Sequence, residues 1–505
     1  MGNRGMHRRG FIKTVGACAA AAGALSGLSR AASEGSGGSG GTQLEEIRRP
    51  LRVKPALVNH IPQRRKEISW RGWGGLQSES DVNEELARID RELKKLASGT
   101  DFPVEMQSVA RVNSDSKVKK LQNADADALL VYAAGGPTGW YDRLQDSDKR
   151  MVWFLRHQSG PVYLWYEIFH PRFLRHNSDT VAWDDANVWD AVVDNYDDLE
   201  WRLRALCGEV NTAETTIVAL GGAGGWGQGG EYGPENAKKI WGIDIKSVPH
   251  EKLTAEMERV RGDEAMMKKL KKQAKDYVNG AGVESVDTSD EFIRTNFVQQ
   301  RAMRNLMERH DACALTVLGC MGYGRTAGSP PCLAFSLIND AGPMAFCESD
   351  FAVIPAGILL RHICGKPVML HNPTLPHDGI MTGAHCTAPR RMSGGKLDPV
   401  KLVTHFESDW GAAPKVQFPR GQKVTSLVPS FTSDRWLGVR STIVGHPFMP
   451  ICRSQMEMEL EGDWVALREQ MRGFHWMSCY GDYLREGGYV LSKKSPDWKA
   501  FVDVT

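Results

Sequence analysis

The sequence lacks a large net charge of either sign, because 63 Lys and Arg residues against 61 Asp and Glu residues leave a formal charge of only +2. A large basic excess is typical of proteins that bind nucleic acid or anionic membranes, and nothing in the bulk charge indicates either partner. A long apolar run is also missing. The apolar stretch at residues 15–28 is too short and too rich in Gly and Ala to be a convincing membrane span. We therefore expect a chain that does not span a membrane.

The cysteines form no Cys-x-x-Cys pair, and the chain contains no internal repeat. Cys18 lies near the N-terminus, and most of the nine others lie in apolar runs. Free Cys is among the most buried residue types, so we expect buried free thiols.

The composition is that of an ordinary soluble protein, with 41% hydrophobic and 25% charged residues. A chain of 505 residues is too long for one hydrophobic core. Two to four domains are therefore expected.

The N-terminus resembles a targeting segment. Arg8 and Arg9 precede an Ala-rich stretch, and Ala31 is a small residue at a position that a signal peptidase reads. We expect residues 1–32 to be a twin-arginine signal peptide and residues 33–42 to be a Gly/Ser linker. The protein would then be exported, to the periplasm or the extracellular space. The alternative is a disordered N-terminus.

The order of strand and helix patterns predicts an α/β fold in three parts. Strands alternate with helices over residues 43–170 and 171–362, which indicates two domains with parallel, Rossmann- or flavodoxin-like sheets. Within the first of them we expect a helix near residues 147–157 and a strand at 162–166. Successive strands without long helices then predict a β-rich, barrel-like C-terminal domain at residues 363–505.

A Gly-rich turn at residues 68–75 contains two Trp residues and follows two Arg residues. Arg71 and Trp73 are weak candidates for substrate binding, as parts of a lid over a polyhydroxyl ligand. The alternative is a loop whose Trp residues fill the edge of a core.

A second Gly-rich run, residues 221–230, follows a predicted strand. It contains Gly-x-Gly-x-x-Gly from Gly222, and Asp244 lies 22 residues further on, which nominally fits a dinucleotide-binding fingerprint. The run is long, however, and we expect the next helix to begin only near Pro234, too late to face a phosphate. A mobile loop near the active site is the preferred interpretation. An oxidoreductase with a nicotinamide cofactor remains the third functional alternative.

The stretch at residues 331–389 contains the densest group of candidate site residues. Two predicted strands end in polar residues, the first at Glu348 and the second at Asn372, and His385 follows shortly after. In α/β folds, ligands bind outside the carboxyl ends of the strands. This stretch is therefore the expected site.

The same stretch resembles the junction between the second and C-terminal domains of the L-fucose isomerase family, with more distant similarity to L-arabinose isomerase. The resemblance covers about residues 312–389 and returns over residues 446–505. It implies a catalytic, metal-binding Glu at Glu348, an acid at the position of Asn372 and a C-terminal His, which we match to His475. His385 resembles the inner metal-site His of arabinose isomerases.

The resemblance implies a metal-dependent interconversion of an aldose and a ketose through an enediol. The metal-ligand candidates that the resemblance implies are Glu348, Asn372, His385 and His475. The cation would be Mn²⁺ or another divalent ion. The catalytic candidates are Glu348, Asn372 and Asp378. Such a reaction needs a base and a group that polarises the carbonyl, and a cation chelated by sugar oxygens does the second.

Asn372 departs from the family pattern, because an amide is neutral and cannot accept a proton. Asp378, six residues on, is a candidate replacement for the missing acid. The second functional alternative is therefore an exported sugar-binding protein, or an enzyme redirected to another reaction, on the isomerase scaffold. The expected partner is a small sugar, and the sequence leaves a homo-oligomer open.

Overall fold

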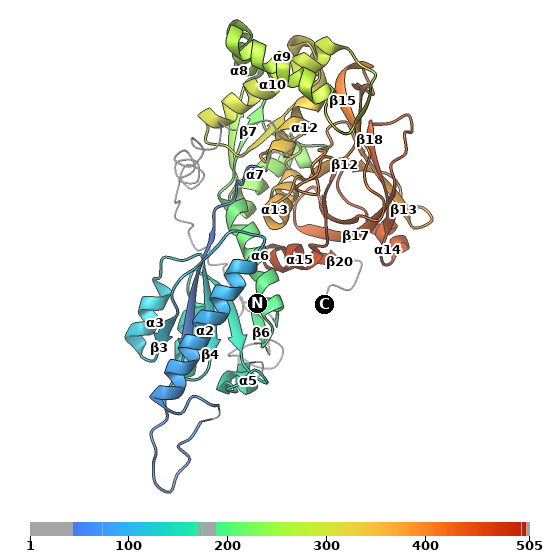
Figure 1. The fold of residues 1–505 in the computed structure, drawn as a ribbon. Coiled ribbons are helices and arrows are strands. Elements are labelled where there is room, and N and C mark those ends of the chain that lie inside the picture. The colour runs from blue at the N-terminus through green and yellow to red at the C-terminus, as the bar shows by residue number, and fades with distance from the viewer. Residues whose placement is uncertain (1–43, 73, 170–173, 175–187, 496, 501–505) are drawn as a thin grey trace, which may run out of the picture.

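The computed structural model describes residues 44–72, 74–169, 174, 188–495 and 497–500. The expected signal peptide (residues 1–32) and linker (33–42) lie outside them. Figure 1 shows an α/β unit at one end of the molecule, a second α/β unit at the other end and a β-rich unit beside the second.

The first α/β unit is built on a parallel sheet. Its strands are β1 (Leu51–Val58), β2 (Val104–Met106), β3 (Ala110–Val112), β4 (Ala128–Ala133), β5 (Arg150–Leu155) and β6 (Ala191–Val193). Its helices are α2 (Glu79–Gly99), α3 (Asp115–Gln122), α4 (Thr138–Gln145), α5 (Leu164–Phe169) and the 3-10 helix η2 (Val188–Asp190). The order is β2-β1-β4-β5-β6, and β3 pairs with the end of β1. Because β6 belongs to it, this sheet continues beyond the boundary expected at residue 170.

Two elements of this unit differ from the sequence prediction. The expected helix near residues 147–157 is the strand β5, and the expected strand at 162–166 is replaced by the helix α5. β5 lies between β4 and β6, and five of its six residues are buried. Strands buried on both faces are apolar throughout rather than alternating, so periodicity alone cannot separate them from a buried helix.

The second α/β unit contains a smaller parallel sheet. Its strands are β7 (Thr216–Leu220), β8 (Asp244–Val248), β10 (Ala314–Val317) and β11 (Met344–Phe346), in the order β11-β10-β7-β8. Its helices are α6 (Tyr196–Ala213), α7 (Gly229–Trp241), α8 (His250–Gly262), α9 (Glu264–Val278), α10 (Asp290–Arg309), α11 (Cys320–Ala327), α12 (Cys332–Ala341) and α13 (Ile354–Cys364). No helix in the described ranges is both long enough and apolar enough to cross a membrane.

The C-terminal part forms a closed, antiparallel, six-stranded barrel, as the consecutive strand patterns predicted. Its strands are β12 (Met369–Pro373), β13 (Ile380–His385), β16 (Lys423–Pro429), β17 (Arg435–Gly445), β18 (Ser454–Leu460) and β19 (Trp476–Tyr480). They pair in the order β16-β19-β12-β13-β18-β17, and pairing of β16 with β17 closes the barrel. Met456 and Met458 are buried, and Glu459, which alternates with them, is exposed.

Further elements surround the barrel. The parallel strand β20 (Asp497–Ala500) extends the sheet beside β17. A separate three-stranded sheet joins β9 (Val283–Val286), from the second α/β stretch, to β14 (Val400–His405) and β15 (Trp410–Val416). Two helices complete this part of the chain, α14 (Trp464–Gln470) and α15 (Leu484–Lys494).

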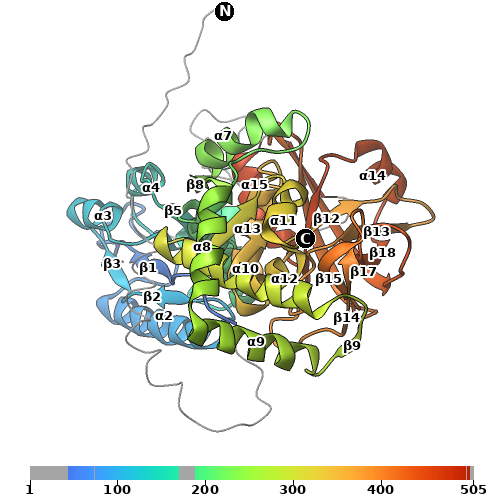
Figure 2. The ribbon, with the colours of Figure 1, turned by 90° about the horizontal axis from the view of Figure 1, so that it is seen from above.

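α13 holds the barrel against the second parallel sheet. A Cβ atom added at Gly357 would lie 2.6 Å from the ring of Phe346, at the end of β11, and 2.8 Å from Sδ of Met477 in β19. Only glycine allows so close a contact. The end of β11 and the start of β19 are thus fixed near one another, and Figure 2 shows α13 between the helices of the second unit and the barrel strands.

Candidate metal centre

Glu348 lies just beyond the end of β11, in a sharp turn. Glu348 and Ser349 both have left-handed backbone angles, with φ of 63° and 53°. Such angles are unfavourable for non-glycine residues and persist only where surrounding contacts hold them. Thr316 on the neighbouring strand β10 supplies such contacts, because its Oγ1 donates to the carbonyl of Phe346 (2.8 Å) and accepts from the Ser349 N–H (3.0 Å). The turn places the Glu348 side chain at the carboxyl edge of the sheet.

His475 enters the site from the barrel, one residue before β19. Its Nδ1 atom lies 2.8 Å from Oδ2 of Asp350, and both side chains are buried. An ionised carboxylate only accepts hydrogen bonds, so Nδ1–H is the donor. The other ring nitrogen, Nε2, is thereby directed towards Glu348.

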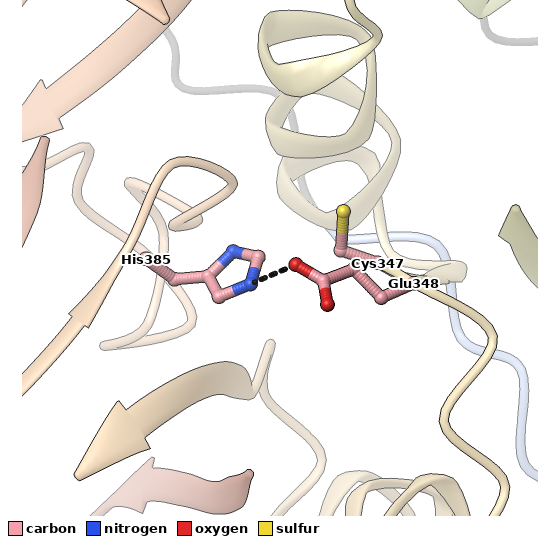
Figure 3. A group of neighbouring side chains, drawn as sticks. All are labelled: Cys347, Glu348 and His385. Carbon is pink, nitrogen blue, oxygen red and sulfur yellow. Dashed lines mark ion pairs between the residues drawn. The ribbon is translucent and has the colours of Figure 1, made fainter. Parts of the chain in front are cut away.

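His385 reaches the same place from the end of β13. Its Nδ1 atom is hydrogen-bonded to Oγ1 of Thr387 at 2.9 Å, and its side chain is 4% exposed. Figure 3 shows its ring facing the carboxylate of Glu348, and the ring centroid lies 5.8 Å from that of His475.

The carboxylate of Glu348 lies between the two imidazoles. Its Oε1 atom is 3.4 Å from Nε2 of His385, and its Oε2 atom is 3.6 Å from Nε2 of His475. Neither Nε2 atom has a hydrogen-bond partner in the described part of the chain, although both are buried. Buried polar atoms normally have partners, and a cation bound here would supply one to both.

The surroundings of Glu348 favour its charged form. Burial opposes ionisation, but the neighbouring imidazoles of His385 and His475 and the indole N–H of Trp226 outweigh it and lower the pKa of Glu348 to about 2. The side chain is 26% exposed, so the carboxylate remains open to a ligand.

Cys347 adds a sulfur atom to the group. One ligand atom from each of Cys347, Glu348 and His385 lies within 4.8 Å of the others (Figure 3). A hydrogen bond with Cys320 and burial raise the pKa of the Cys347 thiol well above its usual value. Metal ligation uses the thiolate, whereas carboxylate and imidazole suit a hard cation such as Mn²⁺ without it. Cys347, Glu348 and His385 are the group of described residues that could hold a metal ion, and Nε2 of His475 lies beside it, 3.6 Å from Oε2 of Glu348.

The Gly-rich run at residues 221–230 lies against Glu348, near the expected site. The indole Nε1–H of Trp226 donates to Oε2 of Glu348 at 2.7 Å. The expected start of the next helix near Pro234 is wrong, because α7 begins at Gly229. The bond from Gly229 N–H to the Trp226 carbonyl (2.9 Å) forms a turn ahead of that proline.

The acid of the nominal dinucleotide fingerprint lies at the other end of the sheet. β7 and β8 are parallel, Asp244 pairs with Thr216, and the Gly-rich run follows Leu220 at the opposite strand end. A fingerprint acid must reach a ribose beside the Gly-rich turn. The position of Asp244 therefore gives no support to a nicotinamide site.

Asn372 lies in β12, one residue after the last pair that joins this strand to β19. β12 and β19 pair antiparallel, and the last pair is His371 with Trp476. Asn372 itself pairs with Ala384 of β13, the residue before His385. No hydrogen bond joins the Asn372 side chain to Glu348 or to either site histidine among the described residues. The amide is a neighbour of the site rather than a bonded member of it.

Asp378 lies away from the other candidates. It is exposed at the tip of the hairpin between β12 and β13. β13 runs for six residues from this tip and ends at His385. At about 3.4 Å per residue, the strand separates the two by roughly 17 Å. The structure therefore does not bring Asp378 to Glu348 to replace a missing acid.

The turn at residues 68–75 is also distant from Glu348 within one chain. Figure 1 shows the connection from β1 to α2 projecting from the end of the molecule far from β13. Arg71 is exposed and lies over the ring of Trp70, 5.7 Å from its centroid. Trp73 lies outside the described residues. A lid made by Arg71 over Glu348 of the same chain has no support from this arrangement.

Three site residues were missed by sequence reasoning. In the sequence Cys347 is one of the expected buried thiols, Trp226 is one residue of the Gly-rich run at 221–230, and Asp350 is not among the candidate site residues. The segment Cys347-Glu348-Ser349-Asp350 carries one usable signal, because a second acid so close to a catalytic Glu is a candidate partner for a histidine. The Gly-rich run gives no sign that Trp226 contacts Glu348.

The comparisons with known proteins add no family assignment. No protein-family model matches the chain. No curated protein matches it significantly.

Proposed function

We propose that the protein is a metal-dependent, isomerase-like enzyme that interconverts an aldose and a ketose through an enediol. The observation that supports this most directly is the position of the Glu348 carboxylate between two buried Nε2 atoms that lack other partners. Glu348, His385 and His475 would hold a divalent cation, with Mn²⁺ the best fit to these donors. The cation would polarise the carbonyl of the sugar.

The residues of the chain have separate roles in this proposal. Asp350 fixes the ring orientation of His475 by accepting its Nδ1–H. Asp350 is buried and already bonded, whereas Glu348 is partly exposed, so Glu348 is the carboxylate that can face a sugar and accept a proton from it. The indole of Trp226 covers one side of that carboxylate.

One observation favours the second candidate, an exported sugar-binding protein or an enzyme redirected to another reaction. Asn372 is an amide, where the resemblance implies an acid. An amide supplies no negative charge to a cation and cannot move a proton.

Mn²⁺ binding and sugar turnover separate these functions. We expect the purified protein to bind Mn²⁺ and to convert at least one member of a panel of aldopentoses and 6-deoxyhexoses to a ketose. The Glu348→Gln variant is the control. Mn²⁺ binding and sugar binding without turnover would favour the second candidate, and a protein that binds neither would contradict both.

A further inference from the structure

We propose that Trp226 is a positioning residue, which holds the Glu348 carboxylate in the orientation that binds the cation. The inference rests on the proposed metal site. It goes beyond the proposed function, in which the indole of Trp226 only covers one side of that carboxylate.

The contact between Trp226 and Glu348 selects one carboxylate oxygen. The indole Nε1–H donates to Oε2 at 2.7 Å, while Oε1 is the oxygen that faces His385 at 3.4 Å. A carboxylate with one oxygen hydrogen-bonded has a fixed plane and leaves the other oxygen for a metal. Without the indole donor, the partly exposed side chain could rotate towards solvent.

The backbone of the Gly-rich run is attached to the turn that contains Glu348. Oγ of Ser349 donates to the Gly222 carbonyl at 2.8 Å, and the Phe351 N–H donates to the Gly224 carbonyl at 3.1 Å. A Cβ atom at Gly225 would lie 2.7 Å from the backbone of Gly229, so the run is also tightly folded on itself. These contacts give the indole one defined position relative to the carboxylate.

The ring of Trp226 also contacts the barrel side of the site. It stacks on Phe474 with ring centroids 4.5 Å apart and an interplanar angle of 19°. Phe474 in turn packs edge-on against His475 at 4.8 Å. Trp226 therefore joins Glu348, from the parallel-sheet unit, to the segment that carries His475. Trp226 and Phe474 are 45% and 42% exposed.

Two substitutions separate the N–H donor from the stacked ring. Trp226→Phe keeps an aromatic ring against Phe474 but removes the donor. Phe474→Leu removes the stacking partner but keeps the donor. With Mn²⁺ alone as the probe, calorimetry should show affinity about 10- to 100-fold weaker for Trp226→Phe. Phe474→Leu should stay close to the wild-type affinity.

A spectroscopic measurement on the wild-type protein gives an independent test. Mn²⁺ is paramagnetic and quenches nearby fluorophores, so it should quench the part of the tryptophan emission that Trp226→Phe lacks. Wild-type emission that Mn²⁺ leaves unquenched would place the cation away from Trp226 and overturn the inference. Thermal unfolding will show whether both variants fold, and the wild-type measurement does not depend on them.

The outcomes separate this inference from the proposed function. Equal Mn²⁺ affinity in wild type and Trp226→Phe would overturn the role of Trp226 and leave the metal site standing. An equal loss of affinity in Phe474→Leu would assign the effect to packing and also overturn it. A wild-type protein that binds no Mn²⁺ would overturn the proposed function and this inference together.

Discussion

The Nδ1 atom of His475 lies 2.8 Å from Oδ2 of Asp350, although 125 positions separate the two residues in the chain. Asp350 follows β11 in the parallel-sheet unit, and His475 precedes β19 in the barrel. This buried contact joins the two units at the candidate site. The orientation of a metal ligand is thus linked to the docking of the barrel.

Replacing Asp350 should weaken metal binding without removing a ligand. In Asp350→Asn the partner of Nδ1 becomes neutral, so the ring of His475 is held less firmly and its Nε2 atom is less basic. We expect Mn²⁺ affinity to fall about 10- to 100-fold, measured by calorimetry. Asp378→Asn is the matched control, because it makes the same change at the exposed hairpin tip. Equal affinities of the two variants would contradict the role of Asp350.

Replacing Glu348 should remove both metal binding and turnover. Glu348→Gln keeps an acceptor for the indole of Trp226 but removes the negative charge between the two imidazoles. Circular dichroism should show an intact fold, and Glu459→Gln, on an exposed position of β18, should behave as wild type. Turnover that survives within about tenfold, or about 1.4 kcal/mol of barrier, would exclude Glu348 as the essential carboxylate.

Asn372→Asp should create a more complete metal site. Position 372 pairs with Ala384, the residue before His385, and a carboxylate that reached a bound cation from there would remain ionised. We expect tighter Mn²⁺ binding than in wild type. Asn372→Ala, which adds no charge, should show no gain. Unchanged affinity in the Asp variant would mean that this side chain points away from the ion.

Asp340 should make stability depend on pH. Its Oδ1 atom accepts the N–H groups of Arg390 and Arg391, both at 2.8 Å, and the buried Oδ2 has no hydrogen-bond partner among the residues that the structure describes. Burial raises the pKa of Asp340 from 3.8 to about 7, although the two N–H groups and nearby charges oppose the rise. The folded state therefore binds a proton that the unfolded state has lost, and this contribution to stability disappears as pH rises through 7.

The Asp340→Asn variant isolates this contribution. Between pH 5 and 8 the wild-type free energy of unfolding should fall on the order of 2 kcal/mol more than that of the variant, measured by urea denaturation. An identical fall in both proteins would show that Asp340 is not the group responsible.

The barrel could be predicted from sequence because its signal is local. Met456 and Met458 alternate with Glu457 and Glu459 in one strand, and such alternation requires a sheet with one buried face. Which strands pair depends on contacts far apart in the chain, such as β12 with β19 and β16 with β17. Local patterns do not encode those pairings. β5 was missed for a different reason, since a strand buried on both faces has no alternation.

The site residues also fall into those with a local sequence signal and those that depend on contacts between distant parts of the chain. Glu348 follows an apolar run, so its position at a strand end could be read from the sequence. His385 was expected only to follow the strand of Asn372, and it ends a strand of its own, β13. His475 was identified through the resemblance, and its contact with Glu348 depends on how the barrel docks. Trp226 and Asp350 act through contacts with Glu348 and His475 that form only in the folded chain, so neither was identified as a site residue.

Glu348, His385 and His475 are expected to bind one divalent cation. Crystals grown with Mn²⁺ and measured at the manganese absorption edge should show this. An anomalous peak is expected about 2.0–2.3 Å from a carboxylate oxygen of Glu348 and from Nε2 of both histidines. A fully soaked crystal with no peak between these side chains, or with its only peak elsewhere, would contradict it.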